Sequence, residues 1–195
     1  MPPYPGGMAP TAQLIDPGAL LATSHKLEDG ARVRLRLTRP TDVRLVRECL
    51  EGLSAKTRAR RLLETGEVTE ETVRSFTFYN PRERLVLAAT MLVDGSERVI
   101  GLADAVFLDT GLAEIGVVVD DDAQGQGLGK LLSEAVASVA LQRGATRLKT
   151  EMLDGNAPML RLLERLGRTV RTVEDGRAVA YTRLQPSRRR GRSAA

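Results

Sequence analysis

Residues 112–141 read LAEIGVVVDDDAQGQGLGKLLSEAVASVAL and predict a β-strand, a glycine-rich turn and a helix in direct succession. Residues 112–119 are apolar and β-branched at their end, which is typical of a strand buried on both faces. From Leu128 to Val139, apolar residues recur at helical spacing. A glycine turn before a helix exposes unpaired backbone N–H groups at the positive end of the helix dipole. The stretch is therefore a candidate site for a phosphate or diphosphate group.

Two common nucleotide-binding motifs do not fit this turn. A P-loop requires glycine at position 124 and serine or threonine at position 131, where the chain has Gln124 and Leu131. A dinucleotide-binding G-x-G-x-x-G motif that starts at Gly125 requires a third glycine where the chain has Lys130. The turn therefore indicates neither a P-loop nor a Rossmann site.

The six residues from Gln124 to Gly129, QGQGLG, resemble the Q/R-x-x-G-x-G/A motif of the GNAT superfamily of acyl-CoA-dependent N-acetyltransferases. Upstream, residues 113–115 look like the strand of that family that carries a glutamate, and downstream LERLG at 163–167 looks like its last helix. The resemblance covers residues 31–184 in element order. It implies a mixed α+β fold, with a central, twisted, mostly antiparallel sheet of about seven strands flanked by about four to five helices.

The patterns outside the motif predict elements that suit such a sheet. Asp94-Gly95 and Asp175-Gly176 lie between apolar runs, which is typical of β-hairpins. The expected segments are a strand at 32–37, a helix at 42–53, a hairpin of 85–93 and 98–107, a strand at 147–152, a helix at 156–166 and a hairpin of 169–173 and 177–184. Residues 1–30 are expected to be a poorly ordered leader, 31–184 the acetyltransferase domain and 185–195 a basic tail.

The resemblance also implies acetyl-CoA as cosubstrate, with no metal, and assigns residues to it. The backbone of Val117, Val118 and Val119 would bond the pantetheine amides. The turn would hold the diphosphate through Gln124, Gly125, Gln126, Gly127, Leu128, Gly129 and Lys130. Gln124 has the alternative role of a helix cap. Asn156 is either a further pantetheine contact or the N-cap of the helix that follows it.

Acetyl transfer to an amine requires a neutral nitrogen, and a lysine amine with a pKa of about 10.4 is protonated at neutral pH. A carboxylate on a buried strand suits removal of that proton, because desolvation raises its pKa. We therefore expect Glu114 to be the general base in a direct attack within a ternary complex; otherwise it is an exposed carboxylate or the partner of an arginine. The backbone N–H of Val118 or a neighbour is the candidate oxyanion donor. Many members of the family have a tyrosine as general acid where this chain has Leu163.

The acceptor is indicated by LSAKTRARRLL at residues 53–63. This segment resembles the L-S-x-x-[ST]-R-x-R-R segment of bacterial protein-lysine acetyltransferases, and it implies a protein-lysine acceptor. Ser54 is expected to cap a helix, and the alternative for the arginines is a solvated helix face. A small amine, such as an aminoglycoside or polyamine, remains an alternative acceptor. A non-catalytic acyl-CoA-binding regulatory module is the alternative outside the enzymes.

Composition restricts the other classes. One cysteine and one histidine give little support to disulfide frameworks, zinc sites or Ser-His-Asp catalysis. No apolar run approaches the roughly 18 residues of a membrane span, so we expect a cytoplasmic protein, either monomer or homodimer. The net charge is +4, but arginines from Arg183 to Arg192 contribute +5, so residues 1–182 have a net charge of −1. Nucleic acid is therefore not an expected partner.

Overall fold

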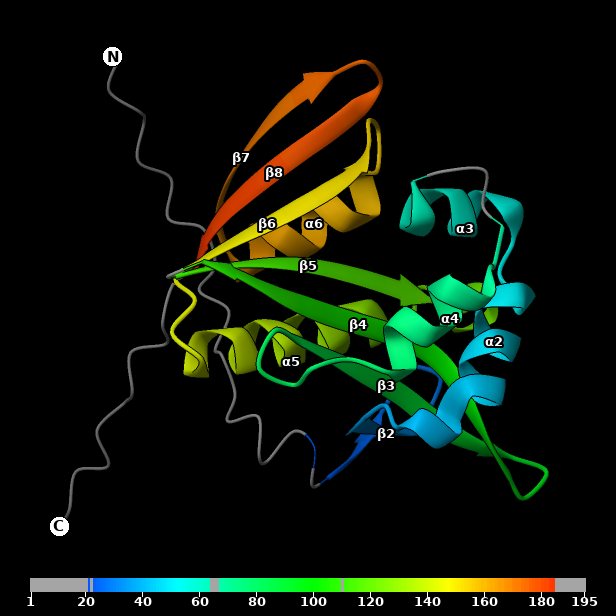
Figure 1. The fold of residues 1–195 in the computed structure, drawn as a ribbon. Coiled ribbons are helices and arrows are strands. Elements are labelled where there is room, and N and C mark those ends of the chain that lie inside the picture. Colours follow the sequence, from blue (N-terminus) through cyan, green and yellow to red (C-terminus); the bar gives the residue numbers. More distant parts are fainter. Residues whose placement is uncertain (1–20, 22, 64–66, 110, 185–195) are drawn as a thin grey trace, which may run out of the picture.

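The computed structural model describes residues 21, 23–63, 67–109 and 111–184. Within these residues an eight-stranded sheet runs in the order β1-β2-β3-β4-β5-β6-β8-β7 (Figure 1). The strands are β1 (Ser24–Lys26), β2 (Arg32–Leu37), β3 (Arg84–Val93), β4 (Ser96–Asp109), β5 (Leu112–Val119), β6 (Arg147–Leu153), β7 (Gly167–Glu174) and β8 (Arg177–Leu184). The helices are α2 (Val43–Gly52), α3 (Ala55–Leu62), α4 (Glu70–Thr77), α5 (Leu128–Gln142) and α6 (Ala157–Leu166), with 3-10 turns η1 (Pro40–Asp42) and η2 (Asp121–Ala123). The mixed α+β class is confirmed.

Helices cover both faces of the sheet (Figure 1). Helices α5 and α6 bury apolar side chains such as Leu132 and Leu163 in a core with alternate residues of the strands. Helices α2 and α4 form a second core on the opposite face, around Leu50 and Phe76. The alternation of β5 divides its residues between the two, because Ile115 lies in the first core and Val118 in the second. The site residues of β5 are thus fixed by packing on both sides.

The sheet begins before the position expected from the sequence. Ser24–Lys26 pair with Arg32–Arg34 of β2, and the following Leu27 is 7% exposed. These residues fall inside the expected leader at 1–30. The rest of that leader up to residue 20, and the tail at 185–195, lie outside the described residues. None of the described helices is long and apolar enough to cross a membrane.

The decisive feature of the sheet is the separation of β5 from β6. These strands are parallel, whereas the other neighbouring pairs of described strands are antiparallel. Their register covers Leu112–Glu114 and Arg147–Lys149, at the start of both strands. Figure 1 shows the two strands close together at one end and well apart at the other, with α3 beside the open end. The second half of β5 therefore has an edge that faces away from β4 and towards an opening.

Candidate functional site

The glycine turn after β5 has the geometry expected for an anion-binding loop. Gly125 and Gly127 have φ angles of 76° and 83°, in the left-handed region that favours glycine. Gly127 is the N-cap of α5, and no side chain caps this end of the helix. The N–H groups of the first turn of α5 consequently have no side-chain partner there. This turn can accept a phosphate group.

The structure brings most of the predicted cofactor residues to one cleft with a volume of about 450 Å³. The cleft is lined by Val117, Val118, Val119, Gln124, Gly125, Gly127, Gly129, Lys130 and Asn156 among others. Two predicted residues are not among its lining. Leu128 is fully buried in the core, and the carbonyl oxygen of Gln126 accepts a hydrogen bond from the Glu28 N–H at 3.2 Å. The motif therefore predicts the positions of these two residues in the turn, but their side chains do not line the cleft.

The cleft also contains cationic side chains that the motif does not include. Its lining adds Arg60, Arg61, Arg161 and Arg165, from α3 and α6. Glu28 is the acidic lining residue, and its carboxylate lies 3.5 Å from where a Cβ of Gly127 would be. Four arginines and Lys130 around the glycine turn give the cleft the charge that a ligand with several phosphates requires. In the sequence, the indication of this charge was the spacing of Arg161 and Arg165, which are one helical turn apart and so lie on the same face of α6.

Gln124 and Asn156 each had two expected roles. Gln124 does not cap α5, because its Nε2 donates to the carbonyl oxygen of Val119 at 3.1 Å and to Thr57 Oγ1 at 3.3 Å. Asn156 is the N-cap of α6, since its Oδ1 accepts from the Met159 N–H at 3.3 Å. Asn156 also lines the cleft, so the cap and a ligand contact are compatible.

The backbone that faces the opening belongs to Val117 rather than Val118. The Asp120 N–H bonds the Ile100 carbonyl of β4, and alternate residues of an antiparallel pair point the same way. Val118 therefore directs its backbone groups towards β4. The carbonyl groups of the alternate residues, Ile115 and Val117, point away from β4 and towards β6. The Ile115 carbonyl accepts a hydrogen bond from Thr150 Oγ1 of β6 at 3.2 Å. Of the expected oxyanion donors, Val118 or a neighbour, Val117 has the backbone groups that face away from β4.

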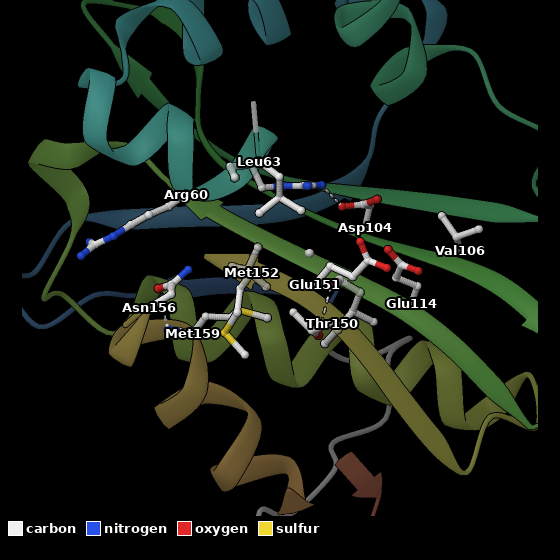
Figure 2. Close-up of a pocket in the computed structure, with 14 residues that line it drawn as sticks. Arg60, Leu63, Asp104, Val106, Glu114, Thr150, Glu151, Met152, Asn156 and Met159 are labelled. Carbon is white, nitrogen blue, oxygen red and sulfur yellow. Dashed lines mark hydrogen bonds and ion pairs between the residues drawn. The ribbon is translucent and has the colours of Figure 1, made fainter. Parts of the chain in front are cut away.

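A smaller cavity of about 90 Å³ lies beside the cleft, on the α3 side of β5 (Figure 2). The two cavities share five lining residues: Arg60, Arg61, Val117, Asn156 and Met159. Figure 2 shows the carboxylates of Asp104, Glu114 and Glu151 gathered at one side, with Arg60 and Asn156 at the other and Met152 and Met159 between them. The cleft and the smaller cavity thus form adjoining compartments.

Glu114 lines the smaller cavity, but it is not the buried carboxylate that the sequence predicted. Its side chain is 34% exposed, and its Oε2 is 3.1 Å from Lys149 Nζ. Lys149 is the residue paired with Glu114 across the parallel strands, and it also contacts Glu151 Oε1 at 2.6 Å. The expected alternative, an arginine partner, is therefore replaced by a lysine.

The wall beside Glu114 is an ionic cluster centred on Asp104. This buried carboxylate binds Arg61 of α3 and Arg84 of β3, the latter at 2.8 Å, and both guanidinium groups lie over the Phe76 ring. Gly116 faces the cluster from β5. A Cβ at this position would lie 2.7 Å from the Arg61 guanidinium carbon, so only glycine lets the guanidinium lie flat against the strand.

Leu53 of the segment at 53–63 packs in the second core, but helix α3 contains no buried residue and is held to the site by polar contacts. Ser54 caps the helix as expected, through the Thr57 N–H. The hydroxyls of Ser54 and Thr57 donate to Asp121 Oδ1 at 2.9 and 2.6 Å, which ties α3 to the turn before the glycine loop. Partial burial of Asp121 opposes its ionisation, but these hydrogen bonds outweigh it and lower the pKa of the carboxyl group. The alternative of a solvated arginine face is wrong for Arg61, whose side chain is 18% exposed.

In the part of the chain that the structure describes, no three His, Cys, Asp or Glu residues are grouped so that they could hold a metal ion.

The residues that sequence reasoning missed are charged side chains from separate segments, chiefly Asp104, Lys149 and Glu151. Each lies on a strand that alternates towards the α3 face, but nothing local marks it as part of a site.

Comparison with known proteins identifies this architecture. The model of the acetyltransferase (GNAT) family matches residues 50–167. The GNAT domain of S. lividans PAT is similar, with a TM-score of 0.73 and 25% identity over 83% of this chain and 96% of that one. A mutant form of the cAMP-binding acyltransferase from Mycobacterium smegmatis also matches, with a TM-score of 0.58 and 25% identity over 84% of this chain, but over 47% of that longer one.

A third structure shares the fold at lower identity. It is the PaiA N-acetyltransferase from Thermoplasma acidophilum in complex with coenzyme A, with a TM-score of 0.56 and 13% identity over 78% of this chain and 99% of that one. The family match spans β4, β5, the glycine turn, α5, β6 and α6, which are the elements that build both cavities. The chain therefore belongs to the acetyltransferase (GNAT) family and is an acetyl-CoA-dependent N-acetyltransferase.

Proposed function

We propose that this protein transfers the acetyl group of acetyl-CoA to a protein lysine by direct attack in a ternary complex. The proposal rests on one observation: two cavities with different linings adjoin where β5 and β6 separate. One is lined by a glycine turn and cations, the other by carboxylates, and they share Arg61, Val117 and Met159. Donor and acceptor can therefore meet without a covalent enzyme intermediate.

The larger cleft has the features that acetyl-CoA requires. The N–H groups of the first turn of α5 and the side chains of Lys130 and Arg165 would hold the phosphates. The Val117 backbone, free of β4 pairing, would bond the pantetheine amides or the thioester oxygen. Acetyl-CoA supplies an activated acetyl group whose thiolate leaves readily.

Proton removal from the acceptor is assigned to Glu114. Its carboxylate lines the smaller cavity and is partly exposed, so a lysine ammonium can reach it directly or through one water. A general base raises the fraction of neutral amine, and the attack then forms the C–N bond and breaks the C–S bond. Leu163 is buried in the core at 1% exposure, so no side chain at this position supplies a proton to the thiolate, and water fills that role.

The acceptor class follows from charge. Asp104 is paired with two arginines, whereas Glu114 and Glu151 share the single ammonium of Lys149, so this group of three keeps a net charge of −1 that can attract a cation to the smaller cavity. The similarity to S. lividans PAT, a protein acetyltransferase, supports a protein lysine over a small amine. A small amine is the alternative outcome of the assay below.

The test is CoA release from acetyl-CoA with a panel of lysine-containing proteins and small amines. Wild type should show acceptor-dependent release, and Glu114→Gln should lower kcat by about 10²–10⁴-fold, the usual contribution of a general base. Glu174→Gln, an exposed carboxylate at the end of β7, is the matched control and should leave the rate unchanged. Cys49 does not disturb a thiol assay of the folded protein, because burial raises its pKa to about 12.

The results separate the alternatives. Release with small amines alone would remove the protein-lysine acceptor and retain the transferase. Acceptor-dependent release that is unaffected by Glu114→Gln would remove Glu114 as the base. Acetyl-CoA binding without release for any acceptor would indicate an acyl-CoA-binding module.

A further inference from the structure

The ammonium group of Lys149 lies between two carboxylates at the mouth of the smaller cavity. Lys149 Nζ is 3.1 Å from Glu114 Oε2 and 2.6 Å from Glu151 Oε1. Figure 2 shows the carboxylates of Glu114 and Glu151 directed towards each other, although they come from different strands. Two carboxylates that face each other in this way repel unless a cation lies between them.

The arrangement is set by the backbone and not by chance side-chain rotation. Glu114 and Lys149 are direct neighbours in the parallel register, at the last pair before β5 and β6 separate. Glu151 is two residues further along β6, so its side chain projects from the same face as that of Lys149. The side chain of Lys149 is 21% exposed, and its hydrogen bonds to Glu151 and Glu114 raise its pKa despite partial burial. The ammonium therefore stays charged at neutral pH.

The other charged residues around this cavity are either paired or lie away from Glu114. On β4, the next charged residue of this face is Asp104, which pairs with Arg61 and Arg84. On α3, Arg60 lines the same cavity, at the far side from Glu114 in Figure 2. The residue opposite Glu114 on β4 is the apolar Val106, and the residue opposite Lys149 on β8 is Tyr181. Within the described residues, Lys149 is thus the cation in direct contact with the Glu114 carboxylate.

We propose that Lys149 is a positioning residue for acetyl transfer: its ammonium holds the Glu114 carboxylate in place in the acceptor cavity against the repulsion of Glu151. This inference rests on the proposed function, because it assigns Lys149 to the base of that reaction. Glu151 has a corresponding role as the second anchor of the ammonium. An incoming lysine ammonium then finds a carboxylate that is already fixed in place.

The variants for the test are Lys149→Met, which keeps a long unbranched stem and removes the charge, and Lys149→Arg, which keeps the charge. Lys26→Met, at an exposed position of β1 that lines neither cavity, is the control for loss of one positive charge. Thermal unfolding and acetyl-CoA affinity of each variant establish that it is folded and binds the donor.

The first readout is the pH profile of kcat/KM, whose acidic limb reports the base of the free enzyme. In Lys149→Met the limb should move to higher pH by about 0.5–1 unit, because Glu114 loses a cation and keeps a like charge beside it. The kcat on the plateau should fall about 3–10-fold with the acceptor KM nearly unchanged, as the carboxylate loses its fixed orientation. Lys149→Arg should restore both values, and Lys26→Met should match wild type.

The second readout does not depend on turnover. A carbon-13 NMR titration of the Glu114 carboxyl carbon, assigned with Glu114→Gln, should show the same upward movement of its midpoint in Lys149→Met. An unchanged midpoint and limb would overturn the proposal. A rate that rises at every pH in Lys149→Met would also overturn it, since Lys149 would then compete with the acceptor. Absence of acceptor-dependent turnover in wild type would instead reject the proposed function, while the titration still decides whether Lys149 controls the charge of Glu114.

Discussion

The two cavities on either side of β5 are built in contrasting ways. The centre of the donor cleft is one contiguous segment, a strand, a turn and a helix start with exposed backbone groups, and α3 and α6 add arginines around it. The acceptor cavity is made from side chains of α3, β4, β5, β6 and α6, held by ion pairs such as that of Arg61 with Asp104. The centre of the donor site is therefore a local property of the chain, whereas the acceptor site depends on the whole fold.

The largest effect is expected from breaking the cluster that holds the acceptor wall. Asp104→Asn would leave Arg61 and Arg84 without an anion in a largely buried site, since these side chains are 18% and 23% exposed. The free energy of unfolding should fall by about 2–4 kcal/mol, measured by urea denaturation. Asp154→Asn breaks an exposed pair with Arg171 and should change it by less than about 0.5 kcal/mol. Equal losses in the two variants would contradict a structural role for the cluster.

The donor cleft should respond to a change of its backbone. Gly127→Val places a β-branched residue at φ 83°, which distorts the turn at the start of α5. The dissociation constant for CoA should rise about tenfold or more, which corresponds to about 1.4 kcal/mol, in isothermal titration calorimetry. Gly95→Val has a similar φ of 78° in the distant β3–β4 turn and serves as the control for strain. An equal loss of CoA affinity in Gly95→Val would show that backbone strain alone, and not the change in the glycine turn at the start of α5, is responsible.

A smaller change should separate the two cavities. In Gly116→Ala the new methyl group would lie 2.7 Å from the Arg61 guanidinium carbon and force this side chain away from β5. The acceptor KM should rise about 3–10-fold, a change of roughly 1 kcal/mol, while CoA affinity stays within about twofold. Gly52→Ala, at a position with open space around it, is the control. A comparable loss of CoA affinity in Gly116→Ala would mean that Arg61 serves the donor cleft first.

The smallest effect concerns the link between the two regions through Asp121. Its pKa is lowered in the folded state, so the unfolded chain binds a proton at higher pH, with a carboxyl pKa of about 3.9. The stability that Asp121 contributes is therefore present above that value and is lost as the pH falls through the folded pKa. The difference in urea midpoint between wild type and Asp121→Asn should be clear at pH 6 and should shrink as the pH approaches about 3.5. A difference that is constant with pH would exclude ionisation as its source.

The same contrast explains what the sequence predicted. The turn at 124–130 and the strand at 112–119 were predicted correctly because periodicity and glycine spacing are local signals. Gly116 illustrates the limit, since its neighbour Arg61 is far away in the chain and nothing in the sequence relates the two. The contact of Lys149 with Glu114 depends on the pairing of β5 with β6, which was not predicted. Leu128 shows a second limit, because the motif gave its place in the turn but not the packing of its side chain in the core.

The separation of β5 from β6 has a consequence for solution measurements. Neighbouring amides of β5 differ in protection, because Val118 faces β4 and Val117 faces the opening. In hydrogen–deuterium exchange, the Val117 amide of the free protein should exchange quickly and that of Val118 slowly. Donor binding should slow exchange at Val117 alone, so one strand contains both a reporter of occupancy and its own internal reference.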